Sequence, residues 1–237
     1  MTGESESGQE QAYPYSYAAE PYSIVEQVRQ KIAPLRFHLA AKEIVKELGL
    51  NPNHKVLEIG SGLGLLGREI RKLTSLDLNY FGIDILFDSA KKSKEALIPV
   101  RADASRLPFP NKSFNHVIST DVLEHLYDPL KAVQEIYRVL KPGGKAFLVI
   151  ADPSEPRFFR IVDHRSRSGK KSDVDWWEQL FLACGFEISE SSKKYRKKDW
   201  RRIFNLPFLA KLKDKPGFAC AFNPVHRPGV YVLKKPE

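Results

Sequence analysis

The chain has 237 residues, of which 42% are hydrophobic and 28% charged, which suits a single soluble domain with a sizeable core. We expect neither a membrane span nor a secretory signal, because no apolar run approaches ~20 residues and no basic stretch precedes an apolar one. Only two cysteines occur, Cys184 and Cys220, in no metal-ligand or redox spacing, so we expect free thiols, no metal site and a cytoplasmic location.

The net charge of +9 is concentrated in two C-terminal segments. Arg157–Lys171 holds six Lys or Arg against one Asp, and Lys193–Lys215 holds ten against two Asp, so the rest of the chain is net negative. The positive charge is therefore a clue to a substrate or surface partner and not to the fold.

The N-terminal region divides into a tail and a helical part. Residues 1–20 are polar and acidic and lack apolar periodicity, so we expect a flexible segment. Ile24–Lys31 and Leu35–Leu48 are predicted as two helices, the second with an apolar stripe and with Gly49 as its stop signal. We expect these helices to form a lid on a single domain that spans 21–237.

Short apolar runs then alternate with helical patterns, which predicts parallel strands joined by right-handed crossovers and hence a Rossmann-like α/β sheet. The predicted strands are Val56–Ile59, Tyr80–Ile85, Ile98–Ala102, His116–Ser119, Ala146–Ile150, Phe186–Ser189 and Gly229–Leu233. The predicted helices are Leu65–Leu73, Phe87–Lys94, Asp128–Leu140 and Asp175–Cys184. Two insertions are expected, 152–173 after the fifth strand and a basic one at 193–226 before the last strand.

The strongest local motif is Val-Leu-Glu-Ile-Gly-Ser-Gly-Leu-Gly at Val56–Gly64, where a buried strand runs into glycines and then a helix. Glycine allows positive φ and close approach of a ligand, and a helix N-terminus offers N–H groups. The motif alone is also compatible with a dinucleotide fingerprint, since Gly62, Gly64 and Gly67 fit G-x-G-x-x-G and Asp84 follows 22 residues after Gly62. In either interpretation Asp84 ends the second strand and can accept both ribose hydroxyls.

Four further motifs follow in order: Val-Arg-Ala-Asp-Ala at 100–104, Arg-Leu-Pro-Phe-Pro at 106–110, Thr-Asp-Val-Leu-Glu-His-Leu at 120–126 and Leu-Lys-Pro-Gly-Gly-Lys at 140–145. With these motifs Lys55–Ala151 resembles the class I S-adenosylmethionine-dependent methyltransferases, in particular the small-molecule group that includes quinone-biosynthesis enzymes. The resemblance implies a doubly wound, mostly parallel sheet with one antiparallel late strand. A dehydrogenase would also need a hydride-transfer domain, which the ~90 residues after the fifth strand hardly supply.

The resemblance implies S-adenosyl-L-methionine as cofactor and a set of residues around it. Those residues are Glu58, Gly60, Ser61, Gly62 and Gly64 at the methionine and ribose end, Asp84 on the ribose, Ile85, Asp103 and Ala104 around the adenine, and Thr120 at the methionine. Glu58 would anchor the amino end, directly or through water. For Thr120 a capping role stays open, and Lys141–Gly144 is expected to be a structural turn.

Methyl transfer from a sulfonium is an in-line displacement, so the protein mainly aligns the reactants and excludes water. A general base is needed only for a protonated acceptor, and His125 is the candidate, although a structural role in its turn is an equal alternative. His164 and Asp163 are weaker candidates.

The acceptor is open at this stage. We expect a small-molecule or lipid-linked acceptor of anionic or aromatic character, with an RNA methyltransferase or a non-catalytic binding protein of this fold as alternatives. The basic, partly apolar stretch 193–215 could dock on the core, lie on an anionic membrane surface or meet nucleic acid. Against methylation of base amines, Thr120–Leu123 stands where an Asn/Asp-Pro-Pro-Tyr-type sequence would be.

Overall fold

The computed structural model describes residues 24–85, 96–150, 174–197 and 229–237. Its elements are α1 (Ile24–Leu48), β1 (Lys55–Ile59), α2 (Leu65–Thr74), β2 (Asn79–Asp84), β3 (Ile98–Arg101), β4 (Phe114–Thr120), the 3₁₀ turn η1 (Leu123–His125), α4 (Pro129–Val139), β5 (Leu140–Ile150), α5 (Val174–Ala183), β6 (Glu187–Ile188), α6 (Glu190–Lys197) and β7 (Gly229–Lys234). The predicted helix at Phe87–Lys94 and both predicted insertions, apart from residues 193–197, lie outside the described residues.

The strands form one seven-stranded sheet in the order β3-β2-β1-β4-β5-β7-β6. Neighbours from β3 to β5 are parallel, whereas β7 runs antiparallel to both β5 and β6. The chain goes outward from β1 to β3 and then returns to add β4 on the other side of β1. This reversal creates a topological switch point between β1 and β4, where ligands of open α/β sheets bind.

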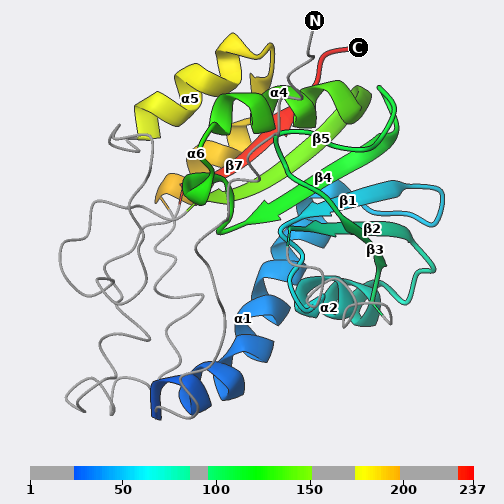
Figure 1. Cartoon of the computed structure of the whole chain (residues 1–237), viewed down its shortest axis with the longest axis vertical. Helices are drawn as coiled ribbons and strands as arrows, with labels where there is room; N and C mark the ends of the chain where they lie inside the picture. Colours follow the sequence, from blue (N-terminus) through cyan, green and yellow to red (C-terminus); the bar gives the residue numbers. More distant parts are fainter. Residues whose placement is uncertain (1–23, 86–95, 151–173, 198–228) are drawn as a thin grey trace, which may run out of the picture.

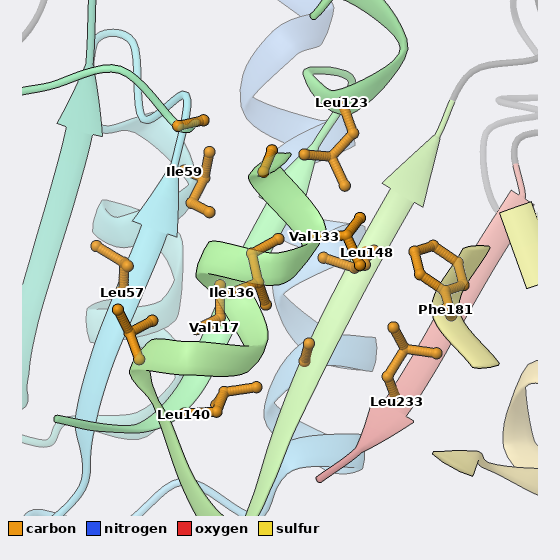
Figure 2. Close-up of a cluster of buried hydrophobic side chains, with 14 of the residues drawn as sticks. Leu57, Ile59, Val117, Leu123, Val133, Ile136, Leu140, Leu148, Phe181 and Leu233 are labelled. Carbon is orange, nitrogen blue, oxygen red and sulfur yellow. The ribbon is translucent and has the colours of Figure 1, made fainter. Parts of the chain in front are cut away.

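Helices cover both faces of the sheet, which makes a three-layer sandwich (Figure 1). One core lies between the sheet and α4 and α5, and Figure 2 shows its aliphatic side chains together with Phe181. The second core lies between the other sheet face and α1, α2 and α6. Alternation along β1 serves both cores, since Leu57 and Ile59 enter the first and Val56 the second.

The N-terminal helices are a correction to the sequence prediction. A single helix, α1, runs through Pro34 from Ile24 to Leu48, whereas the sequence predicted two helices around that proline. A proline removes one helical hydrogen bond and restricts the preceding turn, but it does not oblige a helix to end. The buried stripe consists of Ala41, Ile44 and Leu48, which pack into the second core.

The segment Lys141–Gly144 was predicted as a turn and lies inside β5 instead. The ladder with β4 is irregular there, because Phe114 pairs with Leu140 while His116 pairs with Lys145. Gly143 has φ +71°, and its N–H donates to Lys235 O at 2.9 Å. Gly143 and Gly144 therefore form a bulge inside β5, and not a turn that precedes the strand.

Helix α6 was not predicted, and it continues into residues assigned to the basic insertion. Ser192 of α6 is fully buried, its Oγ donates to Val232 O, and it accepts from Val232 N at 2.8 Å. Tyr195 is also buried against the second core. The first residues of the predicted insertion therefore dock on the sheet, while 198–226 lie outside the described residues.

Candidate cofactor site

The loop after β1 crosses the carboxyl end of β2 and is held there by backbone hydrogen bonds. Gly60 N and Ser61 N both donate to Ile83 O, at 2.8 and 2.9 Å, and Gly62 N donates to Asp84 Oδ2 at 2.9 Å. These three loop donors bond to β2 and are distinct from the N–H groups that the sequence motif predicted at the start of the following helix. The loop is thus preorganised by its own strand neighbour.

The positions of this loop require glycine for different steric reasons. Gly60, Gly62 and Gly64 have φ of 71°, 49° and 71°, a left-handed region that favours glycine. A Cβ on Gly60 would lie 2.2 Å from Val122 Cγ2, whereas one on Gly62 would meet nothing within 4 Å. Gly64 is the N-cap of α2. Gly60 is therefore required by both backbone and packing, and Gly62 by backbone alone.

A cavity of about 210 Å³ opens at the switch point beside this loop. Its walls come from α1, the end of β1, the start of α2 and the end of β4. The lining residues are Phe37, Glu58, Gly60, Ser61, Gly62, Leu63, Leu65, Leu66, Thr120 and Asp121. Ligand sites of this kind usually measure ~300–1,000 Å³, so the cavity suits one end of a nucleoside ligand.

Acids and one unpaired hydroxyl mark the polar side of the cavity. Glu58 is 3% exposed, and burial raises its pKa to about 8, while a hydrogen bond from Tyr80 lowers it and the charge of Asp84 raises it. Ser61 Oγ is buried and has no hydrogen-bond partner among the described residues. A buried acid and an orphaned hydroxyl beside a cavity fit a polar, cationic ligand end.

Asp121 follows β4 directly and was missed as a site residue. It has φ +55°, which aspartate tolerates better than most residues, and its N–H donates to Val149 O at 2.9 Å. Its carboxylate forms an ion pair with Arg36 of α1. The neighbouring Phe37 lines the cavity, so α1 closes this side of the site. A side chain directly after a parallel strand was the available signal for Asp121.

The residues predicted around the ribose and the adenine, from Asp84 onward, are not among those that line this cavity. Asp84 ends β2, its carbonyl accepts from Ala102 N at 3.2 Å, and Ile85 O accepts from Arg101 Nε at 3.3 Å. Asp103 follows β3 at the same edge of the sheet, and its Oδ1 accepts from Ser105 N and Oγ at 2.8 Å each. Asp103 therefore stabilises its own turn, and its contact with adenine stays a prediction.

Two more predicted positions, Ala104 and His125, are also not among the residues that line the cavity. Ala104 is 7% exposed and packs into the first core, and the prediction for it concerns only its backbone N–H. His125 ends the 3₁₀ turn η1, and its N–H donates to Val122 O at 3.0 Å. His125 is half-buried and is not among the residues that line the cavity, so its role as a base also stays a prediction.

Residues 57–148 match a family model described as a methyltransferase domain. The match covers less than half of the chain, and it shows that residues 57–148 are similar to a methyltransferase domain. The matched range runs from β1 to β5 and includes the glycine loop, Asp84 and Asp121.

The curated proteins to which this chain is similar are named for different methyl acceptors. Phosphoethanolamine N-methyltransferase 3 of Arabidopsis thaliana is 26% identical over 77% of this chain and 38% of its own length. Cycloartenol-C-24-methyltransferase 1 of Oryza sativa subsp. japonica is 32% identical over 60% of this chain and 46% of its own length. The chain thus spans less than half the length of these curated relatives.

A solved structure shares the fold of this chain. Phosphoethanolamine N-methyltransferase 2 of Haemonchus contortus, in complex with phosphomonomethylethanolamine and S-adenosylhomocysteine, superposes with a TM-score of 0.58 at 20% identity. The match covers 90% of this chain and 59% of that one. At this identity the likeness concerns the fold alone.

Proposed function

We propose that the chain transfers a methyl group from S-adenosyl-L-methionine to a small-molecule or lipid-linked acceptor. The observation that carries this proposal is the acid-lined cavity at the β1–β4 switch point, beside the preorganised loop of a methyltransferase domain. A sulfonium and an ammonium group carry the positive charges of this cofactor, and the lining acids Glu58 and Asp121 suit them.

The chain's own residues would bind the two ends of the cofactor at two different parts of the sheet edge. Glu58, Ser61 and Thr120 line the cavity and would hold the methionine end, and Asp84 would accept the ribose hydroxyls. Ile85, Asp103 and Ala104 would surround the adenine at the ends of β2 and β3. When bound, the cofactor supplies a methyl group that is already activated on sulfur.

The protein then needs to align an acceptor with that methyl group and keep water away. Phe37 and Leu63 supply apolar walls, and α1 closes one side of the cavity through the Arg36–Asp121 ion pair. His125 follows β4 in the same region and would serve as base only for a protonated acceptor.

The class of acceptor is the least constrained part of the proposal. The names of the relatives point to amine, phosphate-bearing and sterol acceptors, all of them small molecules or lipid precursors. The basic segments 157–171 and 198–215 would suit an anionic acceptor or an anionic membrane surface, but they lie outside the described residues. A cytoplasmic location also stays a prediction.

Two measurements test the proposal in sequence. Calorimetry should show stoichiometric binding of S-adenosylmethionine and S-adenosylhomocysteine to the folded chain. Transfer of radiolabelled methyl should then be measured to phosphoethanolamine, cycloartenol and total RNA. Transfer to a small molecule supports the proposal, transfer only to RNA supports the nucleic-acid alternative, and a silent titration with folded protein supports a non-catalytic binding protein.

A further inference from the structure

Behind the cavity, Glu58 is joined to a second buried polar group that does not itself line the cavity. Tyr80 of β2 is fully buried, and its hydroxyl donates to Glu58 Oε2 at 3.0 Å. Gly82, and not Tyr80, lies opposite Glu58 in the β1–β2 ladder, so the hydroxyl reaches the acid diagonally across the sheet face. One of the two groups thus faces the ligand space and the other supports it from the core.

The tyrosine ring has little freedom to move. A Cβ on Gly67 of α2 would lie 3.3 Å from Tyr80 Cε1, so the helix packs closely on the ring. A Cβ on Gly82 would lie 2.7 Å from both Cβ and Oγ of Ser61, so the loop closes over the neighbouring position on β2. The Tyr80 hydroxyl is therefore fixed with respect to the Glu58 carboxylate.

The charged groups on the surrounding elements do not replace Tyr80. Asp84 on β2 raises the pKa of Glu58, and Arg71 on α2 lowers the pKa of Tyr80, which burial and then Glu58 raise well above its ordinary value. Arg71 itself donates to Ala96 O and Leu78 O. Other charges on these elements include Asp121, paired with Arg36 of α1, Glu69 on α2, paired with His38 and Lys72, and the exposed Arg68 of α2.

We propose that Tyr80 is a positioning residue for the cofactor, whose hydroxyl orients Glu58 at the cavity wall and stabilises its anion when the cationic methionine end binds. The inference rests on the proposed function. Binding then releases the proton that Glu58 holds in the empty cavity, and Tyr80 determines how readily that proton leaves.

The sign of the pH dependence follows from the buried acid. The pKa of Glu58 lies near 8, so at neutral pH the empty site holds a proton, and a bound ammonium group favours its release. Affinity should therefore rise with pH below about 8, by at most about tenfold per pH unit, and level off above it. Removing the Tyr80 hydroxyl should move this plateau to higher pH.

The chain offers a matched control in the same core. Tyr195 of α6 is also buried, and its hydroxyl donates to Glu43 Oε2 at 3.0 Å and Glu47 Oε1 at 2.9 Å. Neither acid lines the cavity. Tyr195→Phe removes the same chemical group from a tyrosine–carboxylate contact that faces no ligand.

The experiment is calorimetry of the 237-residue chain with S-adenosylhomocysteine from pH 6 to 9, in buffers of different ionisation enthalpy that report proton release. We expect Tyr80→Phe to weaken binding about tenfold at pH 7, since a hydrogen bond to a charged group is lost. The pH above which the affinity of Tyr80→Phe levels off should rise by about one unit. Tyr195→Phe should match the wild type. Glu58→Gln should bind weakly and release no proton, and the pH dependence that it keeps should be that of the ligand's own amino group.

A second ligand separates the contribution of the methionine end to the affinity from that of the nucleoside. 5′-Methylthioadenosine lacks the amino-acid end, so its affinity should be the same in wild type and Tyr80→Phe at every pH. Equal pH profiles of wild type and Tyr80→Phe with S-adenosylhomocysteine would overturn the inference while leaving the proposed function intact. If the wild type binds S-adenosylhomocysteine at no pH, both fail. Should Tyr80→Phe not fold, an unchanged pH profile of Glu58→Gln overturns the inference.

Discussion

At the carboxyl ends of β1, β2 and β4 the ionisable side chains are acids, whereas around the amino ends of β1 and β4 they are histidines and lysines. The acids are Glu58, Asp84 and Asp121, and the basic groups are His54, Lys55, His116 and Lys145. Burial acts at both ends, and its consequences differ. At the carboxyl end it leaves an acid at a cavity wall, and at the amino end it gives a pair of histidines bonded to each other.

The histidines of the amino-end pair bond to each other, while Nδ1 of His116 is buried without a hydrogen-bond partner among the described residues. His116 is buried on β4, and its Nε2 lies 2.9 Å from Nδ1 of His54, whose Nε2 lies 2.7 Å from Nδ2 of Asn51. Burial, then the charges of His54 and Lys145, lower the pKa of His116 to about 3. Both ends thus hold a buried polar atom without a partner in the described part of the chain, and the comparison teaches that the carboxyl end differs by its cavity, through which a ligand can reach the buried acid.

The largest expected effect concerns the backbone of the carboxyl-end loop. Gly60→Ala should lower the free energy of unfolding by about 2–5 kcal/mol, because a left-handed residue costs about 1–2 and overpacking against Val122 about 1–3. Gly62→Ala, at positive φ but in open space, should cost only about 1–2 kcal/mol. Urea denaturation measures both, and equal losses would show that Val122 moves aside.

At the amino end, the stability of the wild type should depend on pH through His116. Its folded pKa of about 3 lies below the ordinary 6.5, so as pH falls below 6.5 the unfolded chain takes up the proton first and stability is lost. The charged groups that face this pair are Lys141, which lowers the pKa of His54, and Lys145, which lowers the pKa of His116.

The measurement compares His116→Asn with the wild type by urea denaturation between pH 4.5 and 7.5. Between pH 6 and 4.5 the wild type should lose about 1.4 kcal/mol per pH unit more than the variant. If the two stability curves run parallel over this range, His116 has the same pKa in the folded and the unfolded chain.

The next effect concerns ligand binding at the acidic end. Asp84→Ala should weaken S-adenosylhomocysteine binding by about 1.5–3 kcal/mol, since both the ribose contact and the support of Gly62 are lost. Asp77→Ala, which removes a fully exposed acid paired with Arg71, should leave the affinity unchanged. An Asp84→Ala variant with wild-type affinity would place the ribose elsewhere.

The smallest effect is expected for the ion pair that joins α1 to the end of β4. Arg36→Gln should lower the free energy of unfolding by less than about 1 kcal/mol, because the Arg36 side chain is 48% exposed and salt screens such pairs. A double-mutant cycle with Asp121→Asn measures the coupling. A coupling energy that persists undiminished at high salt would show that the pair is more buried than its exposure indicates.

Much of the fold could be predicted from local pattern. Each of the strands β1 to β4 was predicted to within two residues at either end, because a short apolar run bounded by turn signals is a local property of the chain. The glycine loop and Asp84 were found for the same reason, since the backbone conformation of the loop demands glycine whatever packs around it.

What the sequence alone determined is thus the series of elements, the glycine turn and the methyltransferase resemblance. Only the tertiary structure decided that Tyr80 supports Glu58 across 22 residues, that α1 continues through Pro34 and places Phe37 at the cavity, and that Asp121 pairs with Arg36. The physical reason is that these contacts depend on strand register and helix docking. Both are settled by the packing of side chains that lie far apart in the chain, which no local pattern contains.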